Sequence, residues 1–266
     1  MQEAMERVIA TMWDRYSEPL SLTEMADTAI LSRFHFSRVF RTMTGTSPCR
    51  FLAAVRLYKA KNLLLETSLS VTDISYMVGY NSLGTFTSRF TWSVGASPAR
   101  YRLLSHVGMP LVPSYSSPND ARPTGVVNGL VNMPDTGAPL RVYIAAFDSP
   151  IAQGLPTSCD VLDSSGPYHL GSMPPGDWFI RAAAVATTDV DPRPWIRRPL
   201  FVGECHRITV RPGHSGKIDL DMHPVGPLDL PILLALPELD SVSFPEAEPA
   251  PDLRPHTAGE VVMQPG

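Results

Sequence analysis

A repeated pattern covers residues 21–98 and decides the fold of this part of the chain. The first copy reads S-L-T-E-M-A at residues 21–26 and S-R-F-H-F-S-R-V-F-R-T-M-T-G-T-S-P at residues 32–48. The second copy reads S-V-T-D-I-S at residues 70–75 and S-L-G-T-F-T-S-R-F-T-W-S-V-G-A-S-P at residues 82–98. Two helix-turn-helix units in one compact domain predict a reader of double-stranded DNA.

Helix start and stop signals mark both copies. Ser21 followed by Glu24 is a capping-box pattern, and Ser70 with Asp73 repeats it. Gly45 suits a helix C-terminus. We therefore expect an opening helix at about 2–16, a helix at about 33–43, a long helix at 48–66, and a last short helix that begins at Ser97-Pro98.

The helix after Ser32 carries an apolar stripe on one side and a basic face on the other. The stripe consists of Phe36, Val39, Phe40 and Met43, at the spacing of a packed helix face. The candidate DNA-binding residues of this unit are Arg33, Phe34, Ser37, Arg38 and Arg41. Arginine suits both bidentate contact with guanine and contact with phosphate. A solvated basic face is the alternative, but the repeat and its caps favour insertion into the major groove.

The second unit is chemically weaker. Its candidate DNA-binding residues are Gly84, Thr85, Thr87, Ser88 and Arg89, and only the last is cationic. Gly84 permits close backbone approach, and the threonines can contact phosphate or a thymine methyl group. We hypothesise that the first unit supplies more base discrimination and that the second mainly docks on the DNA.

Residues 5–104 resemble the AraC/XylS-type transcription regulators. The resemblance rests on the motif from Ser32 to Pro48, on Arg56 and Leu57 in the long helix, and on V-G-Y-x-S-x-G-T-F-x-x-R-F from Val78. It implies a seven-helix domain with two recognition helices in successive major grooves. It also implies regulation of transcription, usually activation by contact with RNA polymerase. Here the DNA-binding domain comes first, whereas in most members it comes last.

Composition divides the rest of the chain. We expect an all-α domain at 1–105, a Pro-rich linker at 106–124, a small all-β sandwich at 125–222, and a Pro-rich acidic tail at 223–266 that is disordered. The strands expected are Val126–Val131, Leu140–Phe147, Tyr168–Met173, Asp177–Ala186, Ile208–Val210 and Ile218–Leu220.

The β region resembles the carboxypeptidase regulatory-like domain, which is transthyretin-like or Ig-like. The clearest piece is P-P-G-D-W-F-I-R-A, from Pro174 to Ala182. Such modules mostly serve packing or interaction. Tyr168, Trp178, Trp195 and Phe201 could line a pocket for a small effector, although core or edge positions suit them better. A homodimer interface is a further option.

Charge and cysteine content limit the function classes. Residues 1–105 carry four more Lys and Arg than Asp and Glu, whereas residues 106–266 carry eight fewer. The basic part fits a nucleic-acid partner. Three widely spaced cysteines predict a reduced compartment, and the absence of a signal pattern or long apolar run predicts a cytoplasmic protein without a membrane partner. The His and Cys spacings fit no metal site.

The sequence thus predicts a bacterial DNA-binding transcription regulator, an activator that contacts RNA polymerase, with a β sandwich for dimerisation, partner or effector binding. We expect no enzymatic activity, no catalytic residue and no cofactor. The alternative is a DNA-anchored scaffolding protein whose β domain recruits a partner.

Overall fold

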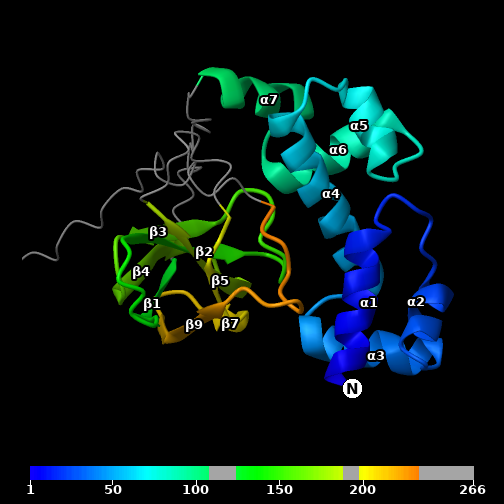
Figure 1. Ribbon diagram of the computed structural model, residues 1–266. Coiled ribbons are helices and arrows are strands. Elements are labelled where there is room, and N and C mark those ends of the chain that lie inside the picture. Colours follow the sequence, from blue (N-terminus) through cyan, green and yellow to red (C-terminus); the bar gives the residue numbers. More distant parts are fainter. Residues whose placement is uncertain (108–123, 188–197, 234–266) are drawn as a thin grey trace, which may run out of the picture.

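The computed structural model describes residues 1–107, 124–187 and 198–233. Its first part is helical and its second part is β-rich (Figure 1). The helices are α1 (Gln2–Asp14), α2 (Leu22–Thr28), α3 (Arg33–Thr44), α4 (Pro48–Glu66), α5 (Val71–Met77), α6 (Leu83–Val94) and α7 (Pro98–Val107). The all-α prediction for this part is confirmed, and the long helix begins and ends at the predicted residues.

The predicted caps set the helix ends. The Ser21 hydroxyl accepts a hydrogen bond from the Glu24 amide, and the Glu24 carboxylate accepts one from the Ser21 amide at 2.8 Å. Gly45 and Gly95 end α3 and α6 in the left-handed conformation, with φ of 74° and 90°. Because only glycine adopts this conformation at no steric cost, the two recognition helices stop at equivalent places.

Equivalent pairs of phenylalanines are buried in the helical core in both units. Phe36 and Phe40 of α3 are fully buried, and so are Phe86 and Phe90 of α6. Phe40 meets the ring of Phe51 edge-on, with centroids 5.5 Å apart. Aromatic rings of this size dominate core energetics, so each recognition helix is fixed on its inner side and leaves its outer side exposed.

Two half-buried arginines hold the connections that lead into each unit. Arg56 of α4 donates from Nε to the Tyr16 carbonyl and from Nη2 to the Glu18 carbonyl, both at 2.7 Å. Burial lowers the pKa of Arg56, but arginine remains charged in proteins. Arg102 of α7 donates to the Leu64 and Leu69 carbonyls in the same way. The arginine on the helix after each unit therefore secures the turn before that unit.

The β-rich region contains nine strands among the described residues. They are β1 (Gly125–Asn132), β2 (Leu140–Phe147), β3 (Ser158–Leu162), β4 (Gly166–Met173), β5 (Gly176–Ala186), β6 (Phe201–Gly203), β7 (His206–Val210), β8 (Ser215–Lys217) and β9 (Leu220–Pro224). They pair in the order β3-β2-β5-β6-β9-β1-β4, with β7 beside β5 and β8 beside β1. The sheet nearly closes around a core that includes Val127, Ile144, Leu170, Ile180 and Leu220.

The structure corrects the β prediction in three places. Strands β3 and β6 were not predicted, because their sequences alternate weakly. The expected strand at 218–220 is replaced by β8 and β9, which stop on either side of Ile218. The Ile218 amide donates to the Asn128 carbonyl, and a Cβ on Gly129 would lie 1.7 Å from the Ile218 carbonyl oxygen. The chain therefore presses so closely on β1 that only glycine fits there.

The predicted tail begins too early. Residues 223 and 224 belong to β9, and Leu230 and Leu233 are buried in the helical core. Residues 234–266 and the linker at 108–123 lie outside the described residues, so the predictions made for them stand as made.

Two segments of the β-rich region join it to the helical domain. We call residues 148–157 the β2–β3 loop and residues 225–233 the post-β9 segment. Ile151 from the first and Leu233 from the second enter the helical core. The Leu233 amide donates to the Ala152 carbonyl at 3.1 Å, and its carbonyl accepts from the Lys61 ammonium at 2.6 Å. Lys61 is 7% exposed, so the helical domain holds the post-β9 segment by a buried charged hydrogen bond.

Candidate nucleic-acid interface

The outer side of α3 presents the basic residues predicted for DNA contact. Arg33, Arg38 and Arg41 are exposed, and Ser37 is half-buried. Phe34 is 88% exposed, which is unusual for a large apolar side chain. Within the part of the chain that the structure describes, none of these three arginines forms an ion pair. Their guanidinium groups are therefore available to an external anion.

The outer side of α6 is polar and almost uncharged. Gly84, Thr85 and Ser88 are exposed, and Thr87 is half-buried. The Thr91 hydroxyl donates to the Thr87 carbonyl of its own helix at 2.8 Å, which leaves Thr91 less able to donate elsewhere. The second unit thus offers hydroxyl groups and a backbone surface where the first offers guanidinium groups.

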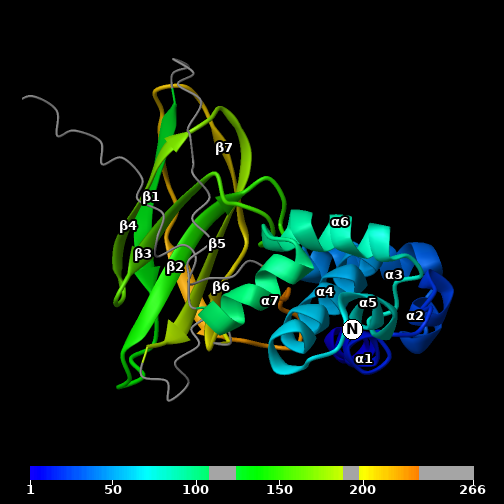
Figure 2. The same ribbon diagram turned by 90° about the horizontal axis from the view of Figure 1, so that it is seen from above.

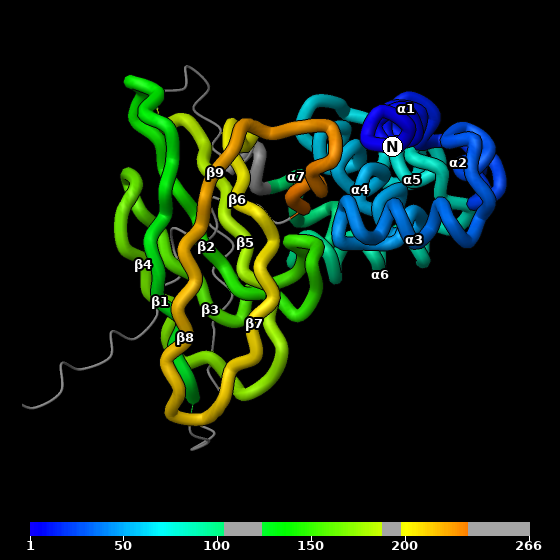
Figure 3. Tube along the Cα trace, turned by 90° about the horizontal axis from the view of Figure 1, so that it is seen from below, coloured from blue at the N-terminus to red at the C-terminus, as the bar shows by residue number. Residues whose placement is uncertain are grey.

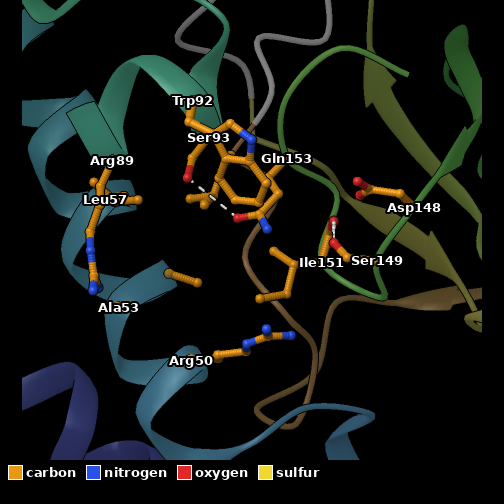
Figure 4. Close-up of a pocket in the computed structure, with 12 residues that line it drawn as sticks. Arg50, Ala53, Leu57, Arg89, Trp92, Ser93, Asp148, Ser149, Ile151 and Gln153 are labelled. Carbon is orange, nitrogen blue, oxygen red and sulfur yellow. Dashed lines mark hydrogen bonds between the residues drawn. The ribbon is translucent and has the colours of Figure 1, made fainter. Parts of the chain in front are cut away.

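Arg89 lies apart from the other predicted residues of α6. Its side chain runs along α4 beside Leu57 and Ala53 (Figure 4). Burial raises the pKa of the nearby Tyr80 phenol, and the positive charge of Arg89 partly opposes that shift. Arg89 is therefore directed between the two units, which the sequence pattern did not reveal.

The two recognition helices lie on one side of the helical domain. Figures 2 and 3 show α3 and α6 on the side opposite α1, with their C-terminal ends toward the β-rich region. Both outer faces can consequently meet one ligand surface. A DNA duplex presents successive major grooves on one side, about 34 Å apart along its axis.

The β2–β3 loop lies close to the C-terminal ends of both recognition helices and is hydrogen-bonded to α6. A Cβ on Gly45, the last residue of the first unit, would lie 3.8 Å from Pro150. A Cβ on Gly95, its counterpart, would lie 3.5 Å from Leu155. The Gly154 amide also donates to the Ser93 carbonyl of α6 at 2.6 Å. One loop of the β-rich region therefore packs against equivalent positions of the two units.

Three of the aromatic residues considered for an effector pocket lie in or against the β core. The Tyr168 hydroxyl donates to the Ile218 carbonyl, and burial raises its pKa. Phe201 packs on the β core, and Trp178 donates from its indole nitrogen to the Pro174 carbonyl. Trp195 lies outside the described residues. Trp178 also lines a cavity together with Trp92 and Leu155, and further cavities lie where the helical and β-rich parts meet.

Neither a metal cluster nor a membrane-spanning helix is found in the described residues. No group of three or more His, Cys, Asp or Glu side chains among them could hold a metal ion. No helix within residues 1–107, 124–187 and 198–233 combines the length and the hydropathy of a membrane span.

Residues 25–103 match the family described as a helix-turn-helix domain. The lactose operon transcription activator of Staphylococcus xylosus is 28% identical over 38% of this chain and 37% of its own length. The bifunctional transcriptional activator/DNA repair enzyme AdaA of Bacillus subtilis is 31% identical over 34% of this chain and 43% of its own. The DNA-binding domain of AdpA, a global transcriptional factor solved with a target DNA, is 29% identical over 40% of this chain and 96% of that domain, with a TM-score of 0.38.

The chain thus spans less than half the length of these two curated relatives, and the likeness is confined to its helical part. The relatives are bacterial transcription regulators, and one of them is also named as a repair enzyme. Residues 25–103 match a helix-turn-helix domain, and the curated relatives that share this part are named as activators of transcription in bacteria.

Proposed function

We propose that this protein is a sequence-specific transcription regulator that places α3 and α6 in successive major grooves of one DNA duplex. The observation that carries the proposal is the arginine face of α3, which is exposed, forms no ion pair with the residues that the structure describes, and lies on the same side as α6. Cationic side chains without partners supply the counterion release that drives DNA binding.

The two units contribute unequally to DNA recognition. Arg33, Arg38 and Arg41 can form bidentate contacts with guanine or clamp phosphates. The outer face of α6 offers threonine and serine hydroxyls, which discriminate bases less. We therefore assign base reading chiefly to α3 and docking chiefly to α6, with Phe34 and Gly84 at the surfaces closest to the DNA.

The β-rich region serves, in this proposal, to hold the two units at a fixed relative position. Support comes from the β2–β3 loop, which packs on Gly45 and Gly95, and from the buried hydrogen bond between Lys61 and Leu233. A fixed spacing matters because two rigid helices must enter two grooves at once. Dimerisation through the β-rich region is the other proposed role, which sedimentation at several concentrations would reveal.

Activation by contact with RNA polymerase completes the proposal. The test is genome-wide mapping of bound sites, paired with transcript changes after deletion of the gene. A regulator gives discrete sites upstream of genes whose transcripts fall on deletion. The scaffolding alternative gives broad, sequence-independent occupancy and no transcript change near the bound DNA, and that pattern would refute the proposal.

A further inference from the structure

Strand β5 is buried along only part of its length. Residues 180–185 are buried, whereas residues 176–179 at its start are exposed or half-buried. Trp178, in this uncovered start, lines a cavity together with Thr91 and Trp92 of α6. The uncovered start of β5, with its partner strand β7, therefore adjoins the second recognition helix.

This end of the β-rich region lies on the side where α3 and α6 present their outer faces. Figures 2 and 3 show β7 and the turn after it reaching past α6 on the side opposite α1. A recognition helix enters a major groove that is about 8.5 Å deep, so the duplex extends outward beyond the helix. Because the C-terminal ends of α3 and α6 point toward the β-rich region, β7 stands beside the flank of that duplex.

The side chains of β7 alternate between the β core and an outward face. Ile208 and Val210 belong to the core, whereas Arg207 and Thr209 are exposed on the other face. Arg211 continues this alternation directly after the strand and is exposed as well. We call Arg207, Thr209 and Arg211 the β7 row. Its two arginines are about 13 Å apart along the chain, so they can reach separate phosphates.

One arginine of the β7 row is held in place by a carboxylate. Asp177 of β5 lies opposite Thr209, and its carboxylate accepts hydrogen bonds from the Thr209 hydroxyl and from Arg207 Nη2, the latter at 2.7 Å. These two hydrogen bonds lower the pKa of Asp177, so the carboxylate is ionised and orients the guanidinium group. A guanidinium group has five N–H donors, and Arg207 therefore keeps donors for a second anion.

Arg211 supplies a cation without a charged partner. It forms no ion pair within the part of the chain that the structure describes, and it lies just past the last residue of β7. Asp148, another carboxylate near this end, lines one cavity with Arg50 and another with Trp178, and neither lining includes a residue of the β7 row. The row thus presents an excess of positive charge toward the flank of the duplex, where phosphates lie.

We propose that the β7 row binds the phosphate backbone of the duplex whose major grooves receive α3 and α6. Arg207 and Arg211 bind phosphate oxygens, while Thr209 stays on Asp177 and keeps Arg207 oriented. Phosphate contacts fix the position of a protein on DNA without reading sequence. The inference rests on the proposed function, because the two recognition helices set the path of the duplex. It gives the β-rich region a direct part in DNA binding.

The test compares the full chain with Arg207→Gln and Arg211→Gln in titrations of two duplexes, one with the preferred site and one with a scrambled site, at several salt concentrations. Each variant should weaken binding to both duplexes by the same factor, about fivefold near 0.15 M salt, and reduce the salt slope by about one. Unchanged affinity and slope in Arg211→Gln would overturn the proposal. A loss confined to the preferred site would also overturn it, because base reading would then explain it.

Arg141→Gln is the matched control. Arg141 also forms an ion pair with a carboxylate, that of Asp163 at 3.1 Å, but it pairs with Val185 at the far end of β5. This variant should bind both duplexes as the unmodified chain does. A loss equal to that in Arg211→Gln would show that any lost positive charge has the same effect, and the β7 row would then not be a contact.

Neutral methylphosphonate linkages, introduced one at a time into the preferred duplex, locate the contact. Linkages beside β7 should weaken the unmodified chain by about fivefold, as the loss of one charged contact does. The same linkages should have little further effect in Arg211→Gln, because the two changes remove one interaction. Equal losses in both proteins at every linkage would overturn a direct contact.

These measurements separate the inference from the proposed function. Sequence-specific binding that neither Arg207→Gln nor Arg211→Gln weakens refutes only the contact by the β7 row. Equal affinity for both duplexes, weakened by these two variants but not by Arg141→Gln, refutes the sequence-specific regulator and supports phosphate binding by the β7 row.

Discussion

At the scale of single residues, Arg38 and Arg89 lie in different surroundings, although the sequence predicted DNA contact for both. Arg38 is exposed on the outer face of α3, whereas Arg89 runs along α4 and lines the junction cavity. Sequence patterning predicted the buried Phe36 and Phe40 of α3, because their spacing is periodic. It could not predict the direction of Arg89, because that depends on how α6 packs against α4.

Arg38→Ala should relax base discrimination by about 1–3 kcal/mol at one position, because a bidentate contact with a base edge is lost. Arg89→Ala should weaken DNA binding by about the same factor for every sequence, and this factor should be smaller than the effect of Arg38→Ala at its base position. Competition between the preferred site and point-mutated sites, at several salt concentrations, measures both effects. Equal loss of discrimination in the two variants would contradict the assignment.

Among the glycines of the second unit, Gly79 leaves the least room for an added Cβ. Its φ is 81°, and an added Cβ would lie 2.7 Å from the Ser17 carbonyl oxygen and 3.1 Å from the Arg56 guanidinium. Gly79→Ala should therefore destabilise the domain by on the order of 1–3 kcal/mol, since both strain and a clash arise. Urea unfolding checks this. Gly137→Ala, at φ 65° with open space around it, is the control for strain without a clash.

At the scale of elements, the N-caps of the helices were the feature that the sequence predicted best. Ser21, Ser32, Ser70 and Ser82 each accept a backbone hydrogen bond at a helix start, as the local sequence predicts. Strands β3 and β6 were missed, because β6 is only three residues long and β3 gains its definition from pairing with β2. Caps are local chemistry, whereas strand pairing is set by distant partners.

Ser21→Ala should cost about 1 kcal/mol of unfolding free energy, because it removes the hydroxyl that accepts from the Glu24 amide and leaves only the backbone half of the capping box. Ser47→Ala is the matched control, because the Ser47 side chain makes no cap hydrogen bond. Hydrogen bonds from Ser21 lower the pKa of Glu24. The contribution of Glu24 is therefore present above the ordinary glutamate pKa and is lost as pH falls through the lower folded-state pKa. Equal destabilisation of both serine variants would argue against the cap.

At the scale of the whole molecule, the junction between the two parts was invisible to sequence patterning. Ile151 and Leu233 come from a loop and from a segment expected to be disordered, yet both are buried in the helical core. Lys61 reads as a surface residue of a helix but is buried against Leu233. Such contacts join residues that are far apart in the chain, so no local pattern signals them.

Ile151→Ser should loosen the junction, because it removes a buried apolar side chain that is 4% exposed. We expect a cost of about 2–5 kcal/mol and separate unfolding transitions for the two parts. Leu130→Ser is the control, because Leu130 is 45% exposed on β1. Calorimetric melting distinguishes the outcomes. A single transition in Ile151→Ser, shifted no more than in Leu130→Ser, would show that the loop does not join the parts.

The central claim is that α3 and α6 enter two successive major grooves on one side of a DNA duplex. The most direct measurement is in vitro selection of random duplex DNA by the full chain, followed by missing-contact footprinting of the selected site. We expect two protected major-groove segments about one helical turn apart on one side, with the segment read by α3 more strictly specified. No enriched sequence, or uniform affinity that salt abolishes, would contradict it.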